Sequence, residues 1–236
     1  SVANGCVTIH CHRVDIAFKY FTFGTFSDLF IIFDKEAING LNRSLFLILI
    51  CEFNRQPSNH PHGVWFDDET LRDGLQSPSA RNPTIEQKIE LLDYMEQLGI
   101  QKVDLGLPGA GPFHRNHIDA MLTHISENGY SIRPGAAVRT LMGDIEPLVE
   151  MQAKHEMEIQ ASAFLGTSPI RQYTEGWTMD KLMTTMEGAV SYAVENDVPV
   201  MFVTEDTTRS NPEDVKKIYH RAMELGVRRL CICDTC

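Results

Sequence analysis

The sequence predicts an α/β fold built from repeated βα units on a parallel sheet. From Gly63 onward, short apolar runs alternate with longer amphipathic stretches, which is the pattern of such units. The segments 97–104 (QLGIQKVD) and 224–231 (ELGVRRLC) repeat one helix end and strand start, as equivalent stacked units require. About six units fit into this part of the chain. A complete TIM (β/α)8 barrel takes about 250 residues, so we expect roughly six of its eight units here.

Each strand is expected where a short apolar run ends in polar residues. The expected strands are 64–69, 102–106, 131–138, 156–164, 199–203 and 228–233. Thr84 and Gln87 form a capping box that begins the first helix, and Asn211 followed by Pro212 begins the last one. Three helices are expected to end at a left-handed glycine, at Gly99, Gly129 and Gly226.

Residues 1–60 differ from the rest of the chain in sequence pattern. They have scattered aromatic residues, few helix caps and no sustained hydrophobic period. We interpret this stretch as a poorly specified N-terminal extension without an assigned role. Residues 61–236 are then a partial barrel domain.

Composition narrows the class of protein. The formal charge of −11 and the isoelectric point near 5.2 argue against binding to nucleic acid or to an anionic membrane. The apolar runs 21–33 and 45–51 are interrupted or too short to cross a bilayer, which needs about 20 apolar residues. The six cysteines are too sparse for a disulfide framework and show no pair of C-x-x-C units, which favours a reducing cytoplasm as the location of the protein.

Polar side chains follow the expected strands at the ends where parallel βα folds carry their chemistry. They are Arg72, Asp73, Arg139, Thr167, Ser168, Arg171, Glu205, Asp206, Arg209, Asp234 and Thr235. All are expected to face one mouth of the barrel, where they are the candidate functional residues.

Arg72 and Asp73 stand side by side after the first strand of this series. A carboxylate is a hard oxygen ligand for a divalent metal, and a permanently charged arginine can donate to an oxygen that becomes negative during a reaction. The pair therefore suits a reaction through an enolate or alkoxide. The alternative is that the two residues merely pair with one another or with neighbours.

Six motifs in order resemble those of the 2-isopropylmalate synthase and homocitrate synthase family, which shares its barrel with 3-hydroxy-3-methylglutaryl-CoA lyase. The stretch 68–76 (DETLRDGLQ) is similar to D-T-T-L-R-D-G-x-Q. The others are LG with DLGLP (98–99, 104–108), AVR (137–139), GTSP (166–169), TEDTTRS (204–210) and CDT (233–235). The resemblance covers residues 63–236 and no part of residues 1–60.

The resemblance implies an acyl-CoA-dependent Claisen condensation of acetyl-CoA with a 2-oxo acid, of the kind used in leucine biosynthesis, with Mn²⁺, Mg²⁺ or Zn²⁺ as cofactor. It implies that Asp73 is a metal ligand, that Arg72 steadies the developing oxyanion and that Glu205 lies near the acetyl group. The implied substrate contacts are Gln76, Arg139, Ser168, Arg171 and Thr235. The family also implies a homodimer when the barrel is complete.

Several departures from the family pattern keep other interpretations open. Leu75 gives the spelling R-D-G-L-Q, which is typical of the lyases, Arg171 replaces a histidine, and Asp104 replaces a glutamate. The family's His-x-His metal ligands lie on the seventh strand and an asparagine on the eighth, beyond the six units present. A carbon–carbon lyase and an inactive barrel fragment therefore remain as alternatives.

Overall fold

The computed structural model describes residues 5–11, 14–20, 29–34 and 64–234, and in these residues the strands form one closed barrel. Six parallel strands, each paired with the next in the chain, make up most of it. They are β4 Val64–Asp68, β5 Lys102–Asp104, β6 Arg133–Arg139, β7 Gln160–Gly166, β8 Val200–Glu205 and β9 Arg229–Asp234. The expected series of about six βα units is confirmed.

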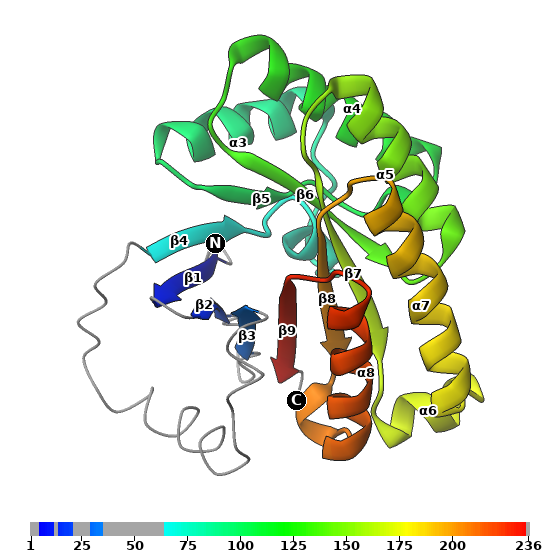
Figure 1. The fold of residues 1–236 in the computed structure, drawn as a ribbon. Coiled ribbons are helices and arrows are strands. Elements are labelled where there is room, and N and C mark those ends of the chain that lie inside the picture. The colour runs from blue at the N-terminus through cyan, green and yellow to red at the C-terminus, as the bar shows by residue number, and fades with distance from the viewer. Residues whose placement is uncertain (1–4, 12–13, 21–28, 35–63, 235–236) are drawn as a thin grey trace.

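Three antiparallel strands close the ring between β9 and β4. They are β1 Gly5–Cys11, β2 Val14–Tyr20 and β3 Leu29–Asp34. β1 pairs with β4, where Gly5 lies opposite Asp68, and β3 pairs with β9, where Leu29 lies opposite Asp234. In Figure 1 these strands lie between β4 and β9.

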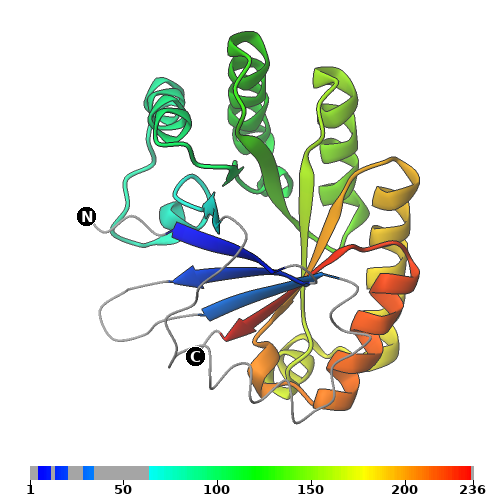
Figure 2. The same ribbon diagram turned by 60° about the vertical axis from the view of Figure 1, so that its left-hand side comes forward.

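Helices follow the parallel strands and cover the outer face of the arc, as Figure 2 shows. They are α3 Ile85–Gln97, α4 Pro112–Asn128, α5 Met142–His155, α6 Pro169–Glu175, α7 Met179–Glu195 and α8 Pro212–Glu224. Short 3-10 turns precede three of them, namely η1 Asp73–Gln76, η2 Pro108–Ala110 and η3 Thr207–Arg209. Among the described residues, no helix is both long and apolar enough to span a bilayer.

Local sequence explains where the helices begin and end. The Thr84 hydroxyl accepts from the backbone N–H of Gln87, and the Gln87 side chain accepts from that of Thr84, which confirms the expected capping box. The three glycines expected to end helices have positive φ angles: 73° at Gly99, 62° at Gly129 and 107° at Gly226.

The largest difference from the expected strand starts is at β7. The segment 156–164 was expected to be a strand, but β7 begins at Gln160 because α5 continues to His155 and Glu156 caps it in the left-handed conformation. A non-glycine residue with positive φ gives no sequence signal as clear as glycine does. The helix end was therefore missed.

Side chains along the strands point alternately into the core beneath the helices and into the inside of the barrel. On β8, Phe202 faces outward into the main core beneath the helices, whereas Met201 packs with Cys231 and Cys233 on the inner side of the barrel. Apolar side chains thus fill the inside around Met201, Cys231 and Cys233. Near β4, β5 and β7 the inside is polar, with Asp67, Lys102, Asp104 and Gln160 all buried.

Candidate active site

The residues after β4 form a tight turn that brings two charged side chains to the mouth. The backbone carbonyl of Glu69 accepts from the N–H of Arg72 at 3.2 Å and of Gly74 at 3.0 Å, and Leu71 is buried in the core. The Arg72 and Asp73 side chains remain 19% and 23% exposed. The turn therefore leaves both side chains partly exposed at the carboxyl end of β4.

Arg72 lies among three carboxylates, which together we call the upper cluster: Glu69, Arg72, Asp73 and Asp104. Its Nε donates to Glu69 Oε2 at 2.7 Å, and Nη2 donates to the same oxygen. Nη1 donates to Asp73 Oδ1 at 3.1 Å, and Nε lies 3.2 Å from Asp104 Oδ2. The pairing with neighbours that the sequence left open is present.

The cluster shifts the acidity of two of its members. Burial lowers the pKa of Arg72, but the charges of Glu69, Asp104 and Asp73 outweigh that effect and hold the pKa above its ordinary value. Burial, reinforced by Glu69 and opposed by Arg72, raises the pKa of Asp104 to about 7. Near neutral pH, Arg72 is therefore fully charged while Asp104 carries only part of a charge.

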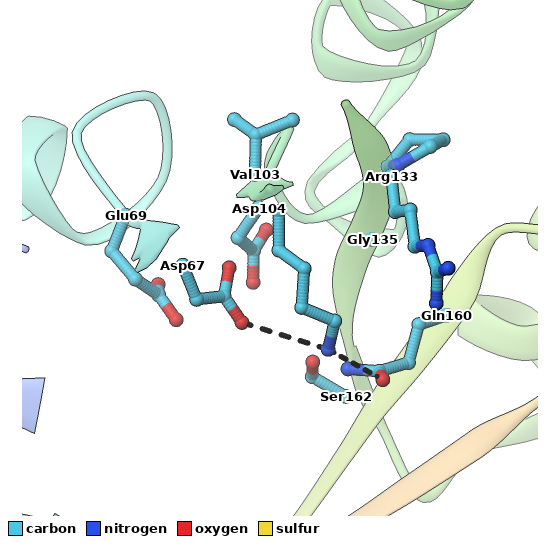
Figure 3. Close-up of a pocket in the computed structure, with 10 residues that line it drawn as sticks. Asp67, Glu69, Val103, Asp104, Arg133, Gly135, Gln160 and Ser162 are labelled. Atoms are coloured by element: carbon cyan, nitrogen blue, oxygen red, sulfur yellow. Dashed lines mark hydrogen bonds and ion pairs between the residues drawn. The ribbon is translucent and has the colours of Figure 1, made fainter. Parts of the chain in front are cut away.

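A second polar group, the lower cluster, lies inside the barrel: Asp67 of β4, with Lys102, Gln160 and Arg229, which are the first residues of β5, β7 and β9. Lys102 Nζ donates to Gln160 Oε1 at 2.9 Å and lies 3.8 Å from Asp67 Oδ2, and Arg229 Nη1 donates to the same Gln160 oxygen. Figure 3 shows the carboxylates of Asp67, Glu69 and Asp104 lining one pocket with Gln160. The two clusters are thus adjacent.

Arg139, at the end of β6, is held by a buried aspartate on α5. Asp144 is 2% exposed, and its carboxylate accepts from Arg139 Nε and Nη2, both at 2.7 Å, and from the Arg139 backbone N–H at 3.0 Å. A Cβ on Gly109 would lie 1.9 Å from Asp144 Oδ1, so this contact requires a glycine there. The Arg139 side chain itself is 48% exposed at the mouth.

Glu205, at the end of β8, pairs with Arg171 on α6. Arg171 Nη2 lies 3.3 Å from Glu205 Oε2, and Nη1 lies 3.2 Å from Glu175 Oε1. The Arg171 side chain passes over Gly166, where a Cβ would lie 3.0 Å from Arg171 Cγ. The structure therefore brings two of the expected site residues, Arg171 and Glu205, into direct contact.

The threonine-rich and serine-rich motifs form a buried framework under these residues. Thr167 donates to Ser210 at 2.9 Å, which joins the motif after β7 to the one after β8. The Tyr219 hydroxyl donates to the Cys231 carbonyl at 2.7 Å and bonds Thr204, and the Cys233 N–H donates to Thr207 at 2.9 Å. These residues fix the ends of β8 and β9.

The other expected contacts differ in access. Gln76 is exposed at the end of η1, whereas Ser168 is fully buried, and its hydroxyl caps α6 by accepting from the Arg171 N–H at 3.4 Å. Asp234 accepts from Thr208 at 2.7 Å. Thr235 lies outside the described residues.

A metal would need more donors than the upper cluster provides. Asp73 has the hard oxygen chemistry that Mn²⁺, Mg²⁺ or Zn²⁺ accepts, but it faces Arg72. Within the described part of the chain, no group of three or more His, Cys, Asp or Glu side chains could hold an ion. These residues alone do not fit a complete metal site.

Sequence reasoning missed the roles of Glu69, Lys102, Asp144 and Gln160. Lys102 and Gln160 each begin a strand, and Glu69 is the last residue of the expected strand 64–69, so only the alternation of inward and outward positions could have indicated that they are buried. Asp144 had a clearer signal, because it lies in the first turn of a helix directly after a strand that ends in arginine.

Fold and site together define a (β/α)8-barrel type of protein with a charged cluster at the carboxyl ends of its strands. A family model described as HMGL-like matches residues 64–236, and the chain belongs to that family. The HMG-CoA lyase of Brucella melitensis has a similar structure, with a TM-score of 0.51 at 16% identity, covering 67% of this chain and 56% of that one. At this identity the likeness shows the fold alone.

Three similar curated proteins are synthases. Homocitrate synthase AksA of Methanocaldococcus jannaschii is 30% identical over 188 residues, which are 79% of this chain and 43% of that protein. The 2-isopropylmalate synthase of Lactococcus lactis subsp. cremoris is 30% identical over 73% of this chain and 33% of its own length. (R)-citramalate synthase CimA of M. jannaschii is 30% identical over 71% of this chain and 32% of its own length. The chain thus spans less than half the length of these relatives.

Proposed function

We propose that this chain forms part of the active site of an acyl-CoA-dependent condensing enzyme, which joins acetyl-CoA to a 2-oxo acid to give an alkylmalate-type 2-hydroxy acid. The observation that carries the proposal is Arg72, a fully charged guanidinium held at the mouth directly beside Asp73. The three synthases to which the chain is about 30% identical support it.

For this reaction the protein must accept one proton and stabilise one developing negative charge. One proton leaves the acetyl methyl group, the resulting enolate carbon bonds to the keto carbon, and the keto oxygen becomes an alkoxide; water then cleaves the thioester and releases the thiol of CoA. Arg72 donates to the oxygen that becomes negative. Glu205 is assigned to the acetyl group, where a carboxylate can accept the proton.

The remaining residues are assigned to the 2-oxo acid. Arg139 and Arg171 are exposed enough to contact a substrate carboxylate, and Gln76 is exposed on η1. Ser168 is inaccessible, so its part is to cap α6 and thereby place Arg171. Thr235 is assigned by resemblance as a further carboxylate contact.

Asp73 is assigned as one ligand of a divalent metal, with the other ligands supplied from outside the described residues. The described residues do not complete that site. The resemblance and the acidic composition also lead us to propose a cytoplasmic homodimer that binds neither nucleic acid nor membranes.

The test is release of free thiol from acetyl-CoA in the presence of Mn²⁺ and a panel of 2-oxo acids. Residues 1–236 alone are expected to turn over negligibly, so the source DNA is first read past the codon for Cys236. A following βα pair with His-x-His would complete the site around Asp73, and the longer protein is then expected to release thiol. Substantial turnover by residues 1–236 would contradict the incomplete site, and a stop codon at that point would contradict an active synthase.

Leu75 favours a second candidate, a carbon–carbon lyase on the same barrel. Such an enzyme cleaves its acyl-CoA substrate to acetyl-CoA and a keto acid, and it needs no water to break a thioester. Thiol release that depends on a 2-oxo acid supports the synthase. Formation of acetyl-CoA from a 3-hydroxyacyl-CoA without thiol release supports the lyase.

A further inference from the structure

Glu69 is a buried glutamate for which the chemistry proposed above has no role. It is 8% exposed, and one of its oxygens, Oε2, accepts from both Nε and Nη2 of Arg72. The two donors converge on this one oxygen and hold the Nε–Nη2 edge of the guanidinium against Glu69. Glu69 therefore controls how Arg72 is turned.

The opposite side of the guanidinium, at Nη1, faces Asp73. Nη1 lies 3.1 Å from Asp73 Oδ1, and the Arg72 and Asp73 side chains are 19% and 23% exposed, whereas that of Glu69 is 10% exposed. Arg72 and Asp73 are thus more exposed than Glu69, which lines the pocket shown in Figure 3. Glu69 can therefore act on a substrate held by Arg72 through the position of the guanidinium.

Asp104 is the weaker partner of Arg72. Its Oδ2 lies 3.2 Å from Arg72 Nε, and its Oδ1 accepts from the Gly106 N–H at 3.0 Å. Because the pKa of Asp104 is raised to about 7, its carboxyl group is partly protonated near neutral pH. The double contact of Glu69 is left as the principal ionic restraint on Arg72.

The main chain supports the same restraint. The Glu69 carbonyl accepts from the N–H groups of Arg72 and Gly74, so residue 69 holds both the side chain and the turn that carries it. A catalytic group must stay within a fraction of an ångström of its working position for full effect. We propose that Glu69 is a positioning residue, whose carboxylate fixes the Nε–Nη2 edge of Arg72 and leaves Nη1 on the Asp73 side; its effect on turnover rests on the function proposed above.

The first test uses NMR on residues 1–236 and needs no turnover. In the wild type, the Arg72 Nε–H signal, assigned by its loss in Arg72→Lys, is expected to persist at pH 8, where the signal of exposed Arg81 exchanges away. Glu69→Gln is expected to speed exchange of the Arg72 signal by about tenfold or more. Among the groups that face Asp104, which are Glu69, Arg72 and Asp67, this change removes one negative charge, so the pKa of Asp104 measured by ¹³C NMR is expected to fall.

The matched control is Glu187→Gln, which removes the carboxylate from another arginine pair, 2.5 Å from Arg221 Nε on the far helices. It is expected to leave both signals of the upper cluster unchanged. Equal exchange of Arg72 Nε–H in the wild type and in Glu69→Gln would overturn the proposal. The wild-type signal gives a second decision that does not depend on any Glu69 variant folding, because rapid exchange there would also overturn it.

The second test uses thiol release by the longer protein. Glu69→Gln is expected to lower kcat by about 100-fold with little change in KM for the 2-oxo acid, since orientation and not binding is lost. Glu69→Asp keeps the charge but is one methylene shorter, so it is expected not to restore kcat; full restoration would indicate a purely electrostatic role and overturn positioning. A wild type without thiol release contradicts the proposed function, and the NMR result still decides the role of Glu69.

Discussion

The upper and lower clusters lie inside the same barrel, yet their charges are arranged in opposite ways. In the upper cluster one guanidinium, that of Arg72, lies among three carboxylates. In the lower cluster two cations, Lys102 and Arg229, donate to one neutral amide oxygen of Gln160. The upper cluster is open at its Arg72–Asp73 side, while Lys102 and Gln160 are buried.

The difference shows how one fold separates chemistry from support. In the upper cluster, three carboxylates surround a single arginine at the mouth. A positive charge in that place can stabilise an oxygen that becomes negative during a reaction. The lower cluster joins β4, β5, β7 and β9 through Gln160, which accepts from Lys102 and Arg229, and through the Lys102–Asp67 pair, so it serves to tie strands together. Changes in the upper cluster should therefore alter activity, and changes in the lower cluster should alter stability.

The largest effect is expected from Arg72→Lys, which tests the functional half of the comparison. Lysine keeps the charge but loses the planar fork, so the double contact with Glu69 Oε2 cannot form. We expect kcat for thiol release to fall by about 1,000-fold. Activity within threefold of the wild type would remove the distinction between the clusters.

The next largest effect is expected from Lys102→Met, which tests the structural half. The change removes one partner of a buried ionic group and leaves Asp67 without its Lys102 contact. Such a loss destabilises a protein by about 3 to 5 kcal/mol. Urea unfolding followed by circular dichroism checks it, and a lost kcat in protein that is still folded would contradict a purely structural role.

The pH dependence of stability is expected to come from Asp104. Its folded pKa of about 7 lies above the unfolded value of 3.8, so its stabilising contribution is complete at low pH and is lost as pH rises toward 7. The shift predicts a loss of about 2 kcal/mol between pH 5 and pH 7. Asp104→Asn is expected to abolish this part of the slope in urea unfolding at pH 5, 6 and 7, and an identical slope in both proteins would rule it out.

The smallest effect on stability is expected from a substitution at Gly109, which tests the contact that holds Arg139. An alanine there would overlap Asp144, the carboxylate that holds Arg139, so Gly109→Ala should destabilise the protein by about 1 to 2 kcal/mol. Gly143→Ala is the matched control, because its Cβ meets nothing within 4 Å and it lies in α5. We expect the control to stabilise the protein slightly. Equal unfolding midpoints in thermal melts would show that Asp144 shifts freely.

The parts of the fold that could be predicted were those encoded by local signals. Thr84 with Gln87, and Asn211 with Pro212, mark helix starts through hydrogen bonds within a single turn, and both are present as expected. Arg72 and Asp73 were identified because they follow an apolar run. The contacts of Glu69, Asp144 and Gln160 were not, since each depends on a partner brought near by the folded turn or by pairing of strands.

The three antiparallel strands occupy the two sheet edges that a longer series of parallel units would also use. β4 and β9 are the first and last parallel strands, and the outer edge of each offers one row of backbone N–H and C=O groups. Here β1 pairs with that edge of β4, and β3 pairs with that edge of β9. A strand edge binds one neighbour at a time. Any additional βα units that join this barrel must therefore displace the amino-terminal strands, so that assembly of the complete ring becomes a competition between two ends of one chain.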